Sequence, residues 1–478
     1  MAGVALSSGG LTTARSPPLA GAVRAMGLAG LAASVAAALW LAVGASEGGY
    51  LLELPSGTAP LWIDGPLHGL GSAIALGPGS LSAGMLVLGG GYLLALSCAA
   101  SIRLRWALVA VVLANLAFTL GPTIVSTDVF GYIAYARELA LHGHNPYISE
   151  PISLGGQLLR YVYWKHQPSP YGPLFTLASA PLGLLSPSCA LWLLKVVAGA
   201  ASIAIAALVA DVARRRGMNA ARAAIFVGLN PLLLLYAVSG AHNDLLAALL
   251  LVVAIALMTR GRDGGAGAAA LAAAAVKLTV GLALPFIVVG AHRRGRASWG
   301  AALAAVAIGV PALLLFGPSM FGQLHRISTD PLFDTTFSGP DRLASMLGSS
   351  IDTAVRVACA AAALMLALTA FVRALRGADA IAAAGWALLA LLASIASLAP
   401  WYVVWLLPFA ALGRSRRLAI ATLLVSGYLL AVHMPALGGL PWLSQPRRST
   451  LVTVTQARGP NVPGLLAREW LQTMPARG

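Results

Sequence analysis

Long apolar runs that contain no charged residue constrain this chain more than any other feature. Residues 25–46 form one such run, and similar runs recur through most of the 478 residues. About 20 apolar residues cross a bilayer as a helix. Hydrophobic residues make up 59% of the chain and charged residues only 10%, whereas soluble domains carry about 25% charged residues. Lipid-exposed backbone must satisfy its own hydrogen bonds, so the sequence predicts an all-α, polytopic transmembrane bundle.

The apolar runs predict about 11 to 13 spans. The clearest are 22–45, 72–98, 106–124, 188–210, 222–238, 240–259, 297–316, 351–373, 380–397, 400–412 and 417–434. Two further stretches, 171–186 and 264–290, either span or re-enter, because Lys277 interrupts the second. We expect a disordered tail over 1–20, a transmembrane domain over 21–435 and a short tail over 436–478.

The net charge of +16 indicates topology rather than nucleic-acid binding. Short clusters such as Arg103/Arg105, Arg214–Arg216 and Arg293–Arg296 flank the apolar runs, and cytoplasmic loops collect basic residues. All clusters fall on one side, provided that 264–290 returns to the side it left. This predicts a multi-pass membrane protein whose polar loops face the outer side. No P-loop or dinucleotide-binding glycine motif is present.

The stretch STDVFGYIAYARELALHGHNPY, residues 126–147, gathers polar and aromatic residues inside this apolar chain. It predicts a short membrane-surface helix from about Val129 to His142, ended by Gly143. On a helical period Asp128, Tyr132 and Tyr135 share one face. Asp128 is either a helix cap or a general base at the membrane boundary. The tyrosines either contact a sugar or belong to an interfacial aromatic belt.

A second polar stretch, SGAHNDLL, breaks a long apolar run at His242, Asn243 and Asp244. Either it is a turn with an Asx cap on the following helix, or it binds a sugar or phosphate, because polar groups at a membrane boundary are costly. The Pro-rich loop at 166–175 and the preceding YVYWK offer Lys165 and Tyr171 as further binding residues, with interfacial anchoring as the alternative.

Isolated cations and a late aromatic motif complete the candidate binding residues. Lys277 either reaches an interface or contacts substrate. Arg342 and Arg356 are able to hold a lipid phosphate, although Arg356 also lies four residues after Asp352, a spacing that suits an ion pair within one helix. Trp401 and Tyr402 lie at a predicted outer turn, where an interfacial aromatic belt is the alternative to substrate binding. The three cysteines, Cys98, Cys189 and Cys359, have no metal-ligand spacing, so we expect inert core thiols, no metal and no cofactor.

The ordered motifs TDVFGYIAYARELALHGHNPY, SPYGPLF, SGAHNDLL, AAAAVKLTVGLALPF and APWYVVWLLPF resemble those of bacterial GT-C glycosyltransferases that use polyprenyl-phosphate sugars. The closest likeness is to the polyprenol-phosphomannose-dependent α-1,6-mannosyltransferases. The resemblance implies an inverting transfer of mannose to a glycan or glycolipid hydroxyl, with Asp128 as base. It also implies roles for the YGPL loop, the His242–Asp244 turn and Lys277. The resemblance further implies a place in the bacterial inner (cytoplasmic) membrane, with the active site facing the periplasm or exterior. Unlike many family members, the chain places this acid alone and after the third predicted span.

A transporter or flippase of a lipid-linked sugar is the alternative function, and a membrane scaffold is a third. A transporter predicts internal repeats and ionisable residues near the membrane midplane. No clear repeat is visible, and Lys195 and Lys277 are the exceptions to a pattern in which ionisable residues lie at helix ends. Membrane lipid is an expected partner in every case.

Overall fold

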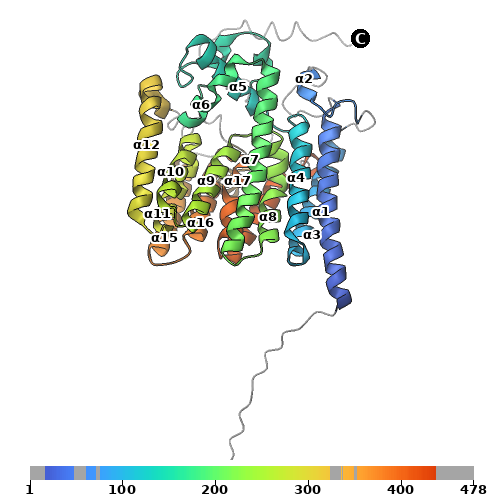
Figure 1. Cartoon of the computed structure of the whole chain (residues 1–478). Helices are drawn as coiled ribbons and strands as arrows, with labels where there is room; N and C mark the ends of the chain where they lie inside the picture. The colour runs from blue at the N-terminus through green and yellow to red at the C-terminus, as the bar shows by residue number, and fades with distance from the viewer. Residues whose placement is uncertain are drawn as a thin grey trace, which may run out of the picture.

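The chain is a helical bundle throughout its described part. The computed structural model describes residues 17–47, 61–71, 76–322, 335, 337–348 and 353–437, and none of these residues lies in a strand. Figure 1 shows the helices standing side by side in one body. The predicted all-α class is confirmed, while most of both predicted tails lies outside the described residues, so the domain limits stay predictions.

Among the described residues, five helices are long and apolar enough to cross a membrane. They are α1 (Pro17–Ala45), α3 (Pro78–Ser97), α7 (Pro187–Arg215), α12 (Arg294–Phe316) and α15 (Thr353–Leu375). Shorter helices complete the bundle: α4 (Leu104–Leu120), α8 (Ala220–Gly228), α9 (Asp244–Thr259), α10 (Asp263–Val276), α11 (Leu284–Gly290), α16 (Ala380–Ser394), α17 (Val403–Leu412) and α18 (Arg416–Val432). The protein is therefore a multi-pass membrane protein.

The two ends of the bundle differ in character. At one end, here called the α5 end, α5 (Asp128–His142) and α6 (Pro173–Ser179) lie above the tops of α9, α10 and α17 (Figure 1). Ion pairs tie the basic loops together at the opposite end, here called the arginine end. There Arg216 contacts Asp379 at 2.7 Å and Arg260 contacts Asp211 at 2.7 Å. Arg414 also donates to the Arg216 carbonyl at 2.9 Å, so three of the basic loops that the sequence placed on one side are joined in pairs.

Residues 263–293 form a helical hairpin whose two ends meet. The carboxylate of Asp263, at the start of α10, accepts hydrogen bonds from the backbone N–H groups of His292 (3.3 Å) and Arg293 (2.8 Å). At the far tip the backbone of Lys277 is extended, with φ −147° and ψ 113°, and it separates α10 from the 3₁₀ helix Leu278–Ala283. The segment therefore returns to the end it left, which is the condition on which the predicted orientation depends.

Helix α5 begins and ends where the sequence predicts, but its surroundings differ from the prediction. It runs from Asp128 to His142 and ends at Gly143, whose φ of +63° is the left-handed conformation that glycine adopts most easily. The side chains of 129–136 and Glu138 are all buried. The helix is enclosed rather than open, since the loops after it and the 3₁₀ helix Ala180–Leu184 pack around it; its location at the membrane surface stays a prediction.

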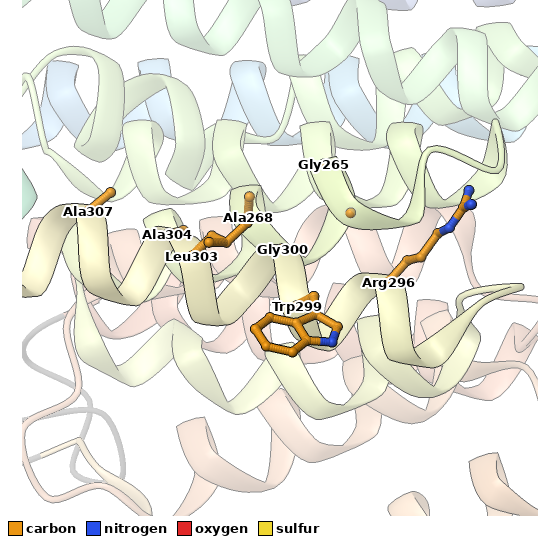
Figure 2. A pocket seen from close by; sticks show the side chains of 9 residues that line it. Gly265, Ala268, Arg296, Trp299, Gly300, Leu303, Ala304 and Ala307 are labelled. Carbon is orange, nitrogen blue, oxygen red and sulfur yellow. The ribbon is translucent and has the colours of Figure 1, made fainter.

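A shallow apolar groove runs between α10 and α12 on the outside of the bundle. Figure 2 shows Gly265, Ala268, Gly300 and Ala304 along it, with Arg296 at one end, Ala307 at the other and Trp299 beside Gly300. The two helix backbones approach closely here, because a Cβ on Gly300 would collide with the carbonyl of Gly264. Small residues commonly allow such approach between membrane helices.

The free cysteines depart in part from expectation. Cys98 is buried and Cys359 is half-buried, whereas Cys189, the third residue of α7, is exposed. The prediction of three core thiols is therefore wrong for Cys189, which lies at the end of a helix on its exposed side.

Candidate active site

The turn before α9 has the most unusual backbone in the described part of the chain. It follows a π-helical turn, Leu233–Val238, and Ala241, at φ +51°, is the one non-glycine residue there with positive φ. Such conformations are rare and concentrate at functional sites. The Asn243 side chain makes no capping bond to α9, so the simple Asx-cap interpretation is wrong.

The turn delivers three consecutive buried polar residues. His242, Asn243 and Asp244 are 1%, 2% and 0% exposed. Burial of this kind is costly unless each polar group has a partner, so their contacts define the site.

The start of α5 meets this turn. Asp128 Oδ2 lies 3.6 Å from His242 Nδ1, and the Asp128 side chain is 17% exposed while that of His242 is 0% exposed. One helical turn later, the Tyr132 hydroxyl lies 3.4 Å from the same His242 nitrogen and 3.5 Å from Asn243 Oδ1. Asp128 thus sits at the rim of the cluster, where it is open on one side.

Thr127 occupies the cap position of α5 without a side-chain capping bond. The Ser126 hydroxyl accepts a hydrogen bond from the Asp128 backbone N–H at 3.3 Å, so Ser126 contributes to capping and the role of Asp128 as base stays a prediction. Burial raises the pKa of Tyr132 well above its usual range, and the charges of Asp128 and Asp244 act in the same direction. Tyr132 accordingly remains a neutral hydroxyl beside the carboxylate.

The hairpin tip supplies a cation to the third residue of the turn. Lys277 Nζ donates to Asp244 Oδ1 at 2.7 Å, and the indole N–H of Trp405 donates to the same oxygen at 2.7 Å. Lys277 also lies over the rings of Tyr402 and Trp405, 4.4 and 5.1 Å from their centroids. The expected reach of Lys277 toward an interface is wrong, because its ammonium is held inside the bundle by an ion pair and two aromatic faces.

Aromatic rings line both sides of this cluster. Trp401 stacks on His242 with ring centroids 3.8 Å apart, and Tyr402 stacks on Trp405 at 4.4 Å. On the α5 side, Tyr171 meets Tyr132 edge to face at 4.8 Å. Burial raises the pKa of Tyr171 well above its usual range, with Asp128 as a smaller cause in the same direction. These rings form side walls, and an aromatic belt at the membrane surface does not describe them.

Each residue of the turn keeps one polar atom without a hydrogen-bond partner in the described part of the chain. The atoms are His242 Nε2, Asn243 Nδ2 and Asp244 Oδ2. Buried polar atoms are nearly always paired, and three in succession mark a place where a polar ligand is able to complete the network.

Some predicted residues lie elsewhere. Tyr135 is on α5, but its hydroxyl donates to the Gln167 carbonyl at 2.8 Å and secures the following loop. Arg342, on α14 (Gly339–Met346), donates from Nε to the Tyr428 hydroxyl of α18. Lys165 is half-buried in the loop after α5, and Arg356 lies on α15. Tyr135 also meets the Tyr171 ring edge to face, with 6.1 Å between the ring centroids, so it borders the cluster around Asp128.

The sequence analysis did not single out two residues whose contacts bear on the cluster: Trp405, which donates to Asp244, and Ser239, whose hydroxyl bonds to Pro122 and Ile124 just before Asp128. Trp405 follows Trp401 by four residues, which places both on one helix face, and this spacing was available in the sequence. No such spacing marks Ser239, because its role depends on hydrogen bonds to Pro122 and Ile124, more than 100 residues earlier.

Metal ligands do not gather in this part of the protein. Within the described ranges no three His, Cys, Asp or Glu side chains come together as a metal site. The prediction that no metal or cofactor is needed stays a prediction.

Comparison with known families places the chain. Residues 24–293, more than half of its length, match the family described as "Alpha-(1->6)-mannopyranosyltransferase, N-terminal domain", and residues 343–455 match the "MptB C-terminal domain". The chain belongs to this mannosyltransferase family. The N-terminal match contains Asp128, the His242–Asp244 turn and Lys277, and the C-terminal match contains Trp401, Tyr402 and Trp405.

Individual family members are distant in sequence. The chain is 26% identical to "Alpha-(1->6)-mannopyranosyltransferase A" of Mycobacterium tuberculosis over 358 residues, which cover 66% of this chain and 67% of that protein. It is 31% identical to "Alpha-(1->6)-mannopyranosyltransferase B" of Corynebacterium glutamicum over 150 residues, 28% of this chain and 24% of the relative. The chain thus spans only about a quarter of the second relative. No solved structure matches the chain.

Proposed function

We propose that this family member transfers mannose from a polyprenyl-phosphate donor to a hydroxyl group of a glycan or glycolipid. One observation carries the proposal. A partly exposed carboxylate, Asp128, meets the buried His242–Asp244 turn, and a lysine and aromatic walls stand beside that turn. A mannosyltransferase needs a base to deprotonate the acceptor and a cation to bind the donor phosphate. Asp128 and Lys277 supply these two groups in the cluster.

Asp128 acts as the general base. A carboxylate within hydrogen-bond reach of an attacking hydroxyl is able to take its proton. Asp128 is open on one side, whereas Asp244 is fully buried and already accepts two hydrogen bonds through Oδ1. A single accessible carboxylate suits a single displacement with inversion, because a double displacement requires a second carboxylate as nucleophile.

The bond changes balance in this scheme. The acceptor oxygen bonds to the anomeric carbon, the bond from that carbon to the phosphate oxygen breaks, and polyprenyl phosphate leaves with the electron pair. The hydroxyl proton passes to Asp128. No cofactor besides the lipid-linked donor is required.

Lys277 is the cation that we assign to the donor phosphate. An ammonium has three donors, and one of them meets Asp244. The Trp401 and Tyr402 rings flank the same cluster and offer flat faces for the sugar. The unpaired atoms of His242 and Asn243 are suited to the sugar hydroxyls.

The site is assigned to the outer face of the cytoplasmic membrane. The support is electrostatic: the ion-paired basic loops lie at the arginine end, and basic loops favour the cytoplasm. The lipid tail of the donor dissolves in the bilayer, so a site at the membrane boundary suits it.

The decisive experiment uses membranes that contain the protein and radiolabelled polyprenyl-phosphate mannose. Asp128→Asn keeps the size of the side chain but removes the base, so transfer to endogenous acceptors should fall by about 10²- to 10⁴-fold. Glu150→Gln is the matched control, since Glu150 is an exposed acid at the same end whose contact is His166, at 3.9 Å. We expect this control to stay within about twofold of wild type, in line with the small worth of exposed ion pairs.

Unchanged transfer by Asp128→Asn would remove Asp128 as base. No transfer by wild type, combined with movement of a labelled lipid-linked sugar across vesicles, would favour the transporter alternative.

A further inference from the structure

Lys195 is a buried cation that the proposed chemistry does not use. It lies within α7 and is 0% exposed. An ionisable residue inside a membrane bundle is expensive and is retained for a purpose. Its contacts in the structure indicate that purpose.

The ammonium of Lys195 joins two backbone segments. Nζ donates to the carbonyl oxygen of Ser239 at 2.8 Å and to that of Pro122 at 3.4 Å. The Trp192 ring also lies 5.8 Å from Nζ, measured to its centroid. Because Nζ is enclosed and faces two carbonyl groups, it is placed to hold protein backbone and is closed to a lipid phosphate.

Ser239 strengthens the same joint. Its hydroxyl donates to the Pro122 carbonyl at 3.3 Å and accepts from the Ile124 backbone N–H at 3.0 Å. Together with the two bonds from Lys195, these link the loop at 121–127 to the residue that opens the SGAHND turn.

Each of these segments leads directly to one member of the catalytic cluster. The 121–127 loop ends at Asp128, and Ser239 lies three residues before His242. Between Ser239 and His242 stands Ala241, whose positive φ is unfavourable for a residue with a Cβ. Such a conformation persists only where the surroundings impose it, and the joint around Lys195 supplies that constraint on one side of the turn.

We propose that Lys195 is a positioning residue for sugar transfer, because it fixes the Asp128 loop to the His242 turn. This inference rests on the proposed function for its catalytic consequence, while the joint itself is independent of it. Loss of the ammonium leaves both segments folded but free to shift relative to each other, so the 3.6 Å approach of Asp128 to His242 is no longer maintained.

Hydrogen–deuterium exchange on the purified protein in lipid nanodiscs tests the joint. Lys195→Met keeps the length of the side chain without the ammonium. We expect faster exchange in peptides that cover 121–127 and 239–244, and unchanged exchange at the hairpin tip around Lys277. Ser202→Ala is the control: Ser202 is buried two turns further along α7, and its hydroxyl has no partner in the described part of the chain.

Transfer kinetics on the same variants test the catalytic consequence. Lys195→Met should lower kcat at least tenfold and leave the donor KM within twofold, while Ser202→Ala behaves as wild type. In a His242→Ala background, Lys195→Met should lower kcat by less than threefold, because residues that act through one another are not additive. Ser239→Ala, which keeps the lysine, should give the same local pattern and serves if Lys195→Met does not fold.

The outcomes separate the two proposals. Wild-type exchange in both the Lys195 and Ser239 variants, faster exchange across the whole protein, or local loosening with unchanged kcat would each overturn the positioning role. Absence of transfer by wild type would overturn the proposed function, and the exchange measurement would still decide whether Lys195 joins the two segments.

Discussion

At the scale of single residues, the Asp244–Lys277 pair dominates the energetics of the site. The two side chains are 0% and 15% exposed and meet at 2.7 Å. Desolvation offsets much of the attraction in a buried pair, but removal of one partner leaves an uncompensated buried charge. The pair therefore makes each of its members hard to replace alone.

Lys277→Met should lower the free energy of unfolding by about 3–5 kcal/mol. The double variant Asp244→Asn with Lys277→Met should recover much of this loss, because neither charge is then left alone. Thermal unfolding in detergent measures both. A double variant as unstable as the sum of the two single variants would contradict the ion pair.

Glu138 gives a second prediction at this scale, for pH. Burial raises its pKa from 4.5 to about 7, although the Ser149 hydroxyl acts in the opposite direction. The folded state then binds the proton more tightly than the unfolded state. The contribution of Glu138 to the free energy of unfolding is therefore greatest below pH 4.5 and falls as the pH rises to about 7. The loss amounts to at most about 3 kcal/mol.

The comparison with Glu138→Gln isolates this effect. The unfolding temperature of wild type should fall between pH 5 and 7 as Glu138 loses its proton. In the variant this part of the fall should be absent. Parallel pH curves for the two proteins would show that Glu138 does not titrate in this range.

At the scale of elements, the sequence predicted where helices end or are interrupted better than it predicted which residues those positions contact. The end of α5 at Gly143, the turn at His242 and the interruption at Lys277 were all visible as polar or glycine residues in apolar surroundings. Their partners were not visible. Asp128 and His242 are 114 positions apart, and Asp244 and Trp405 are 161 positions apart. A helical period shows which residues share a face, but it carries no information on what that face meets.

The strained turn predicts that glycine affects stability in opposite directions at two neighbouring alanine positions. Ala241→Gly should leave stability unchanged or raise it by up to about 1 kcal/mol, because glycine adopts positive φ without a Cβ penalty. Ala237→Gly, in the preceding π-helical turn, should instead cost about 1 kcal/mol. Unfolding temperatures of the two variants check this, and equal destabilisation by both would contradict the strain at Ala241.

At the scale of the whole molecule, the distribution of charge was the most reliable sequence signal. The basic clusters depend only on local composition, and the structure joins several of them at the end opposite α5, through contacts of Arg216 with Asp379 and of Arg260 with Asp211. The enclosure of α5 was not predictable in the same way. It results from the packing of loops that carry little periodicity of their own.

Orientation is testable by labelling with a membrane-impermeant maleimide in a cysteine-free background. Ile148, 65% exposed near the α5 end, should react in intact cells as Ile148→Cys. Arg262→Cys, in the exposed turn before α10, should react only after permeabilisation, because basic loops favour the cytoplasm. The reverse pattern would place the candidate site on the cytoplasmic face.

The shortness of α9 and α10 has a consequence for depth. At 1.5 Å per residue, their 16 and 14 residues rise about 24 and 21 Å from the arginine end, whereas the hydrocarbon core is about 30 Å thick. A helix of this length that starts at one boundary of the core ends about 6–9 Å short of the other boundary, so we infer that the Asp244–Lys277 pair lies below that second boundary, with α5 and α6 above it. A reaction at this depth is shielded from bulk water. We therefore expect the lipid-linked sugar bound there to be protected from hydrolysis until an acceptor binds.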